Sequence, residues 1–231
     1  MRPLKFTSLV LLTMLAPKAV FAERVLFLEG SPRGEQSASS KVAKEFIKAY
    51  LKVHPTDTVD VLNVWNERLP ELTGDTLEAR YAIMNKTQLS AQQKKAWEKV
   101  TETFKRFARA DKYIISVPMW NFGVPYKFKH YMDIVTQPDM AFLETKSGSK
   151  GQITDKPVVI FYSSGGDYSA GTPAEKFDHR KRFVGNWLKF IGFKDKDISE
   201  VPIMGTLSPE AKEHKQKALT EATQLAETWG K

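Results

Sequence analysis

Short blocks of apolar residues alternate along this chain with longer segments whose apolar positions repeat at helical spacing. Residues 24–28 form an almost unbroken apolar block, which predicts a strand buried on both of its faces. In residues 37–53 the apolar side chains recur at intervals of three to five positions, which predicts an amphipathic helix. The short β-branched segment 58–62 predicts a second strand.

The same alternation continues through the rest of the chain. Residues 90–93 fit a capping box, and a second helix is predicted after them with Trp97, Val100, Phe104 and Phe107 on its core face. The other predicted elements are strands at 113–117, 157–162 and within 198–203, and helices at 124–135, at 176–190 and from Ser208–Pro209 onward. Residues 63–89 contain Pro70, Gly74 and few periodic apolar positions, so we expect a long excursion that acts as a lid or contacts a partner.

Five strands that alternate with helices predict an α/β fold: a doubly wound sandwich with a parallel five-stranded sheet and helices on both faces. We expect a single domain over residues 23–231. Ligands of such sheets bind beyond the carboxyl ends of the strands, at the point where the strand order reverses. The segments 30–40, 118–122 and 163–166 all follow predicted strand ends and are therefore the candidate ligand segments.

Residues 1–22 differ from the rest of the chain. Their start is basic, residues 6–16 are almost continuously apolar, and residues 20–22 suit cleavage. This arrangement predicts a secretory signal peptide, with an uncleaved N-terminal anchor and a wrongly chosen start codon as alternatives. A working leader would make the protein exported or periplasmic, and without one it would be cytoplasmic.

Composition narrows the possible functions. The formal net charge is +8 and 27% of the residues are charged, but Lys and Arg are scattered and the longest basic run, Arg180–Arg182, is short. We therefore expect a solvated basic surface, with no nucleic-acid binding and no stable membrane association after leader cleavage. The chain has no cysteine, which excludes disulfides, thiolate nucleophiles and Cys-based metal sites.

The segment 30–40 offers hydroxyl groups at Ser31, Ser37 and Ser39 around the start of a predicted helix. Backbone N–H groups and the positive end of the helix dipole favour a dianion at such a place without a paired lysine. The segment lacks the Gly-Lys-Ser/Thr ending of a nucleoside-triphosphate loop and the G-x-G-x-x-G spacing of a dinucleotide site. It suits a terminal monophosphate, and a Ser-capped helix after an ordinary turn is the alternative.

The segment 118–122 combines a sulfur, an aromatic ring and a carboxamide directly after a buried strand. Met119 and Trp120 supply apolar walls, and Asn121 can both donate to and accept from the edge of a heterocycle. Gly165 and Gly166 would allow a third backbone segment to approach the ring closely. Together these segments predict a planar, phosphate-bearing cofactor, although Met and Trp at a strand end also serve as ordinary packing residues.

Other chemistries lack their motifs. No two of the histidines stand at metal-ligand spacing, and there is no G-x-S-x-G segment of a serine hydrolase. We predict no metal site and assign no catalytic acid or base.

The segment Pro118–Phe122, together with Tyr131–Asp133, resembles the FMN-dependent NADH-azoreductases, also called FMN-dependent NADH:quinone oxidoreductases, of the flavodoxin-like superfamily. The resemblance runs from about Val25 to the last helix. It implies that Ser31 and the Ser37-Ala38-Ser39 turn hold the FMN phosphate. It also implies two groups of residues around the isoalloxazine, which are Met119, Trp120, Asn121 and Phe122 on one side and Ser163, Ser164, Gly165 and Gly166 on the other edge.

The resemblance further implies a homodimer with flavin sites at the subunit interface and two-electron ping-pong transfer from NADH to quinones and azo compounds. Ser164 stands where relatives often have Arg, and Leu143 and Glu144 stand where they often have a basic residue and an aromatic. These departures concern substrate and donor preference. A general NAD(P)H:quinone reductase without azo activity, a one-electron flavodoxin-type carrier and an exported binding protein without flavin are the competing hypotheses.

Overall fold

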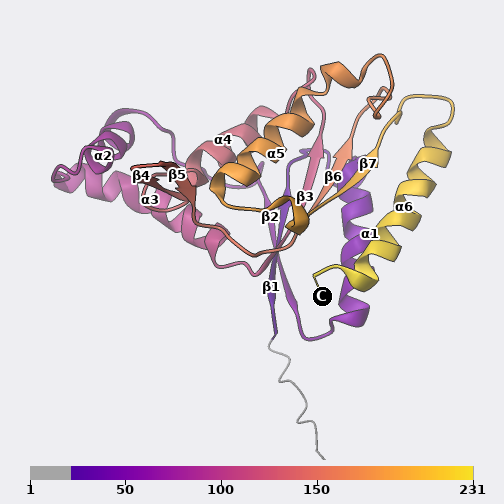
Figure 1. Ribbon diagram of the computed structural model, residues 1–231, viewed down its shortest axis with the longest axis horizontal. Coiled ribbons are helices and arrows are strands. Elements are labelled where there is room, and N and C mark those ends of the chain that lie inside the picture. Colours follow the sequence, from indigo (N-terminus) through magenta and orange to yellow (C-terminus); the bar gives the residue numbers. More distant parts are fainter. Residues whose placement is uncertain (1–21, 231) are drawn as a thin grey trace, which may run out of the picture.

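Five parallel strands form the central sheet of the protein, whose computed structural model describes residues 22–230. The strand order is β2-β1-β3-β6-β7, so the chain reverses its direction of winding between β1 and β3 (Figure 1). This order confirms the predicted doubly wound fold and puts the switch point at the carboxyl ends of β1 and β3. The strands are β1 (Arg24–Glu29), β2 (Thr58–Asn63), β3 (Lys112–Pro118), β6 (Val158–Ser163) and β7 (Ile198–Ile203).

Helices cover both faces of the sheet (Figure 1). On one face lie α1 (Ala38–Val53) and α6 (Ala211–Thr228), which pack on each other and on Val25 and Phe27 of β1. The other face is covered by α3 (Ala91–Ala108), α4 (Tyr126–Val135) and α5 (His179–Ile191). Because the central strands are buried on both sides, their sequences are continuously apolar instead of alternating.

The predicted capping box is confirmed at the start of α3. The backbone N–H of Gln93 donates to Ser90 Oγ at 3.2 Å, and the backbone N–H of Ser90 donates to Gln93 Oε1 at 2.8 Å. Of the predicted core face, Trp97, Val100 and Phe107 are buried, and Phe104 is half-buried against the main core.

Residues 63–89, which we expected to form a long excursion, contain the helix α2 (Gly74–Met84), which the sequence pattern did not predict. This helix packs on α3, where Ala79 joins a small cluster with Trp97 and Val100. Only Thr76 and Ala79 of α2 are buried, so the helix has no apolar stripe that the sequence pattern could reveal. A second unpredicted element is the hairpin of β4 (Phe142–Thr145) and β5 (Gly148–Gly151).

Three predicted helix starts differ from the structure. Pro125 is the N-cap of α4, so that helix begins at Tyr126 and not at 124. The helix expected from 176 is interrupted, because a 3₁₀ turn at Glu175–Phe177 precedes α5 and Asp178 caps the latter. Ser208 and Pro209 belong to a turn, with the N–H of Ala211 donating to the Ser208 carbonyl at 3.1 Å, and α6 begins only at Ala211.

β7 is an edge strand that pairs only with β6, and it carries Pro202, which has no N–H to offer a further strand. No helix within residues 22–230 is long and apolar enough to cross a membrane. The leader predicted at 1–22 lies outside the described residues except for Ala22, so it stays a prediction.

Candidate functional site

The three candidate ligand segments lie next to one another at the carboxyl ends of β1, β3 and β6, which are neighbours in the sheet. The N–H of Gly30 donates to the Ser116 carbonyl at 2.9 Å, which joins the first segment to β3. The N–H of Met119 donates to the Ser163 carbonyl at 2.8 Å, which joins the second segment to the third. The structure therefore brings together the residues that the sequence analysis placed in one site.

The first segment leads from β1 into α1. Gly30 is required at its start, because a Cβ atom there would lie 2.7 Å from the Ser116 carbonyl oxygen. Ser37 caps α1 by accepting a hydrogen bond from the backbone N–H of Ser40 at 3.3 Å. Its Oγ also lies 3.3 Å from Ser39 Oγ, and Ser31, Ser37 and Ser39 are all buried. Three hydroxyl groups thus surround a helix start whose first N–H groups have no helical carbonyl to bond, which suits a phosphate.

A buried acid lies beside this helix start. Glu29, the last residue of β1, accepts a hydrogen bond from Asn63 Nδ2 at 2.8 Å. Its second carboxylate oxygen, Oε1, is buried without a hydrogen-bond partner and lies 3.9 Å from Lys44 Nζ on α1. Lys44 itself forms a hydrogen-bonded ion pair with Glu35 and lies near Glu29, so its charge is already shared by two carboxylates. A phosphate at this helix start would therefore depend on hydroxyl and N–H donors, as the sequence pattern indicated.

The second segment forms a tight turn with unusual backbone geometry. Trp120 and Gly123 exchange two backbone hydrogen bonds of 3.0 and 2.9 Å, with Asn121 and Phe122 between them. Both central residues have positive φ, 46° at Asn121 and 68° at Phe122. Non-glycine residues in this region cost about 1–3 kcal/mol each and gather at functional sites. The turn leaves the side chains of Trp120 and Phe122 38% and 47% exposed.

The buried side chain and the backbone N–H of Arg180 fix this turn to the ends of the strands. Its guanidinium is fully buried, and Nη1 donates to the carbonyls of Val117 and Ser163 at the ends of β3 and β6. Nη2 donates to Asp178 Oδ2 at 2.7 Å, and the backbone N–H of Arg180 donates to the Phe122 carbonyl at 3.0 Å. The expectation that the run 180–182 lies on the surface is wrong for Arg180, because the strand-end carbonyls and Asp178 compensate its charge inside the protein.

Arg180 also contacts the ring of Tyr162, whose centroid lies 4.9 Å from the guanidinium carbon. Burial raises the pKa of the Tyr162 phenol, so this hydroxyl stays neutral over the physiological range. The positive charge under the turn is therefore balanced by Asp178 alone among the side chains that bond to it.

The third segment is fixed by the loop after β7. The N–H groups of Thr206 and Leu207 donate to the carbonyls of Ser164 and Gly165 at 3.0 and 3.1 Å. Ser164 is buried, and its hydroxyl bonds to the Gly166 carbonyl at 2.9 Å and to Met204 Sδ at 2.9 Å. The hydroxyl thus shapes the loop itself. The two glycines of the segment allow the side chains of Leu207 and Tyr168 to approach its backbone closely.

Sequence reasoning missed two aromatic residues that complete the site. Trp65 lies within the segment expected as an excursion, yet its Nε1 donates to the Gly30 carbonyl at 3.0 Å. Its ring centroid lies 5.5 Å from that of Trp120 and 5.0 Å from that of Tyr126, which is 64% exposed. An aromatic residue two positions after the end of β2 was the signal that could have identified it. These three rings form an aromatic wall beside the strained turn.

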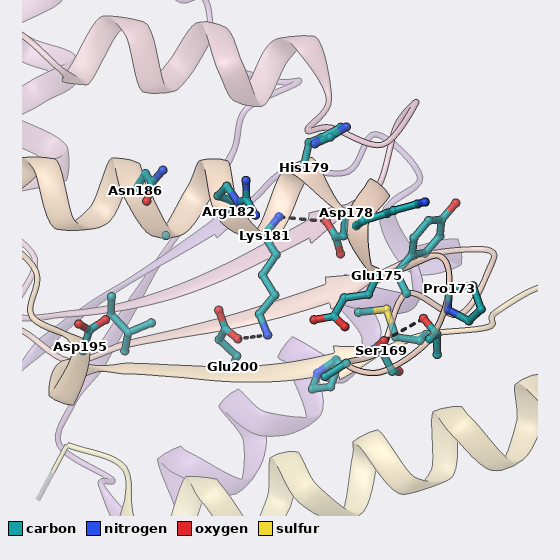
Figure 2. Close-up of a pocket in the computed structure, with 18 of the residues that line it drawn as sticks. Ser169, Pro173, Glu175, Asp178, His179, Lys181, Arg182, Asn186, Asp195 and Glu200 are labelled. Carbon is teal, nitrogen blue, oxygen red and sulfur yellow. Dashed lines mark hydrogen bonds and ion pairs between the residues drawn. The ribbon is translucent and has the colours of Figure 1, made fainter.

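A groove of about 1040 Å³ lies next to the site, between α5, the loop that precedes it and the outer edge of β7 (Figure 2). Lys181 reaches across it to Glu200 at 2.6 Å, and its backbone N–H donates to Asp178. Ion pairs therefore line this groove, whereas the flat aromatic surfaces lie over the strand ends. No group of three or more His, Asp or Glu side chains within residues 22–230 is arranged to hold a metal ion.

The residues at the strand ends fit FMN. Buried hydroxyls and first-turn N–H groups suit its phosphate, and the exposed carboxamide of Asn121 between aromatic side chains suits the edge and faces of a flavin. The strained turn is the observation that separates this site from ordinary packing, because an unconstrained loop would not retain two residues at positive φ.

Comparison with known proteins gives a consistent result. A family model described as "Flavodoxin-like fold" matches residues 23–226. The chain is 40% identical over 205 residues to an FMN-dependent NADH:quinone oxidoreductase of Nitratidesulfovibrio vulgaris, with 87% of this chain and 97% of the relative covered. FMN-dependent NADH:quinone oxidoreductase 2 of Pseudomonas syringae pv. tomato is 38% identical, with the same shares of the two chains covered.

Solved structures agree with these relatives. An azoreductase from Bacillus anthracis superposes with a TM-score of 0.81 at 28% identity, covering 90% of this chain and 100% of that one. An FMN-dependent NADH-azoreductase from Bacillus anthracis, solved in complex with FMN, gives a TM-score of 0.79 at 25% identity and covers 88% and 97% of the two chains.

Proposed function

The chain belongs to the family of proteins with the flavodoxin-like fold, and from this membership we propose that it is an FMN-dependent oxidoreductase that transfers two electrons from NADH to quinones and azo compounds. The observation that carries the proposal is the strained Trp120–Gly123 turn beside a serine-lined helix start. The relatives supply the chemistry, because their names state FMN dependence, NADH, quinones and azoreduction.

Different segments of the site would hold different parts of FMN. Ser31, Ser37 and Ser39 would hold the phosphate, and the segment from Met119 to Phe122 would hold the isoalloxazine. FMN, when bound, supplies the acceptance and release of two electrons. Trp65, Trp120 and Tyr126 form an apolar wall that excludes water from one side of the ring site and offers a stacking surface to a planar substrate.

We infer a ping-pong order, in which donor and acceptor use the same aromatic surface in turn. The exposed rings at the strand ends, which include Phe122 near Tyr168 and Phe177, support this order because they offer one shared stacking surface. Parallel initial-rate lines at several quinone concentrations support it, and converging lines would contradict it.

A homodimer with the site at its interface forms part of the proposal. Exposed apolar side chains gather around the strand ends, among them Tyr126 and Leu207, the latter 88% exposed. Such a patch favours contact with another protein surface. Sedimentation that shows only monomer at micromolar concentration would contradict the dimer.

We also propose that residues 1–22 are a signal peptide and that the mature protein is exported. In that compartment the electrons would come from a reductant other than cytosolic NADH, and the flavin site would stay the same. Retention of the full-length chain in the cytoplasm, shown by cell fractionation, would contradict export.

The visible absorption spectrum of the purified protein tests the central proposal. We expect a yellow protein that NADH bleaches under anaerobic conditions and that a quinone restores, and an azo dye should also be reduced. A flavin that accumulates in a stable one-electron-reduced form would favour the carrier hypothesis. A colourless protein that also does not bind added FMN would favour the hypothesis of a binding protein without flavin.

A further inference from the structure

Glu23, the residue before β1, is anchored at its N–H, its carbonyl and its side chain. Its backbone N–H donates to Asp57 Oδ1 at 2.9 Å, and its carbonyl accepts from the N–H of Thr58 at 2.9 Å. Its carboxylate lies 2.6 Å from Lys112 Nζ. Residues next to a chain end are poorly ordered unless they are tied down in this way.

The acceptor of the Glu23 N–H is a buried carboxylate. The Asp57 side chain is only 3% exposed, and its second oxygen accepts a hydrogen bond from the Tyr50 hydroxyl at 2.5 Å. His54 Nδ1 lies 3.9 Å from the same oxygen. Among residues 22–230, no lysine or arginine lies within ion-pair distance of this carboxylate, and its Oδ1 accepts its hydrogen bond from the Glu23 nitrogen.

The buried ammonium nearby is already engaged. Lys112 is almost fully buried, and its Nζ bonds to the Glu23 carboxylate and to the Tyr50 hydroxyl at 3.1 Å. At the amino end of the sheet, Lys112 thus pairs directly with the Glu23 carboxylate and is linked to the Asp57 carboxylate only through the Tyr50 hydroxyl. A second fixed positive charge next to Asp57 Oδ1 would balance the two carboxylates.

We propose that Asp57 is the binding site for the α-ammonium group of a chain that begins at Glu23. Hydrolysis of the peptide bond between Ala22 and Glu23 by an export endopeptidase consumes one water, leaves a carboxylate on Ala22 and converts the Glu23 amide nitrogen into an amine that takes up a proton. That nitrogen is the one that already donates to Asp57. Ala22 is exposed, so water can solvate the remaining ammonium protons. Cleavage thereby adds an ion pair to the fold.

The proposal predicts the direction of a pH effect. The ordinary pKa of an α-amino group is about 7.7, and a neighbouring buried carboxylate raises it. The added stability is therefore fully present below about pH 7.7 and is lost as the pH rises through the higher folded-state pKa. The titratable and charged groups that face the amine are those of Glu23, Tyr50, His54, Asp57 and Lys112, with Arg24 and Asp111 next along the chain.

The test starts from the full chain, exported from a bacterial cell, and reads its N-terminus by mass spectrometry. All described elements lie between Arg24 and Thr228, so a chain that begins at Glu23 contains the whole fold. This chain is compared with one that begins at Ala22, whose ammonium is displaced by one residue, and with the Asp57→Asn variant of the Glu23 chain. The α-amino pKa of each is measured from the pH dependence of N-terminal acetylation.

We expect export to give Glu23 as the first residue. In this chain the α-amino pKa should lie about one unit above that of the other two, and its unfolding constant below pH 7 should be about tenfold smaller than that of the Ala22 chain. The difference in unfolding constant should vanish at pH 10 or above. Equal α-amino pKa values in the Glu23 and Ala22 chains would overturn the proposal, as would an exported chain that begins at another residue. The Ala22 chain keeps Asp57, so the test stands even if Asp57→Asn does not fold.

Discussion

The two ends of the central sheet are built in opposite ways. At the amino ends of the strands, Lys112, Tyr50 and Asp57 bond to one another inside the protein, and Trp229 covers them from the end of α6. At the carboxyl ends, the backbone is held at positive φ and aromatic side chains remain exposed. Within the described residues, these three polar side chains are linked to one another at the amino ends, where only His54 Nε2 and Trp229 Nε1 among their neighbours are buried without a partner, whereas the carboxyl ends leave surfaces open for a ligand. The difference indicates which end contributes stability and which end gives up stability for binding.

Arg180 gives the largest test of this difference, because it lies at the carboxyl ends of the strands and nevertheless contributes stability. Replacing it with Met removes the donors to Val117 and Ser163 and leaves the buried Asp178 carboxylate without its ion pair. We expect a loss of about 3 kcal/mol in the free energy of unfolding, because one partner of a buried pair is removed. Urea unfolding of the flavin-free protein measures it, and FMN retention should fall as the turn loosens.

The neighbouring residue provides the control. Lys181 forms a partly exposed pair with Glu200, so Lys181→Met should cost less than about 1 kcal/mol and leave FMN retention unchanged. Equal losses in the two variants would show that burial of Arg180 has no special role. If Arg180→Met does not fold, Arg180→Lys supplies a smaller loss of the same sign.

Two substitutions at Asn121 distinguish the effect of backbone strain on stability from the effect of the carboxamide on FMN binding. Both Asn121→Ala and Asn121→Gly remove the carboxamide, and we expect each to weaken FMN binding about tenfold through the lost hydrogen bonds. Only the glycine variant also relieves the positive φ, so it should stabilise the flavin-free protein by about 1 kcal/mol. Fluorescence titration with FMN and urea unfolding measure the two effects.

Lys86, in the turn after α2, also has a positive φ, of 55°, but does not belong to the candidate ligand segments. It therefore serves as the control for the effect of relieving a positive φ. Lys86→Gly should stabilise the protein by a similar amount without any effect on FMN. Unchanged flavin content in Asn121→Ala would show that the carboxamide does not contribute to FMN binding, whatever the stability of the variants.

Asp60 tests the amino end with a smaller effect. Its hydrogen bonds with Arg106, at 2.7 and 3.0 Å, lower the pKa of the carboxyl group below its ordinary value. The stability from this pair is therefore present above the unfolded pKa of about 3.9 and is lost as the pH falls through the folded value. Because the pair is partly exposed, Asp60→Asn should cost less than about 1 kcal/mol at pH 6.

The difference in urea midpoint between Asp60→Asn and the parent protein should become smaller as the pH is lowered from 6 to 3, because this range includes the unfolded-state pKa. Asp155, whose pair with Lys194 lies on the surface, is the control, and Asp155→Asn should leave the midpoint unchanged at both pH values. A difference at Asp60 that is equally large at pH 6 and pH 3 would mean that packing, not charge, makes its contribution.

The sequence predicted the strands well because burial on both faces makes a parallel strand a continuous apolar block. It failed at α2, whose buried residues are too few to set a period, and at the β4–β5 hairpin, whose residues are mostly exposed. In the site, the segments after β1, β3 and β6 were predictable because strand ends meet at one edge. Trp65 and Arg180 were not, because their contacts join residues that are 35 and 63 positions apart.

Pro202 has a consequence for how the protein behaves at high concentration. An edge strand such as β7 offers a row of unpaired backbone groups on which another chain can add a strand and begin an aggregate. Proline interrupts that row, because it has no N–H and its ring obstructs an approaching backbone. Pro202 therefore protects this edge of the sheet, and replacing it with valine should shorten the time before turbidity appears in a concentrated solution.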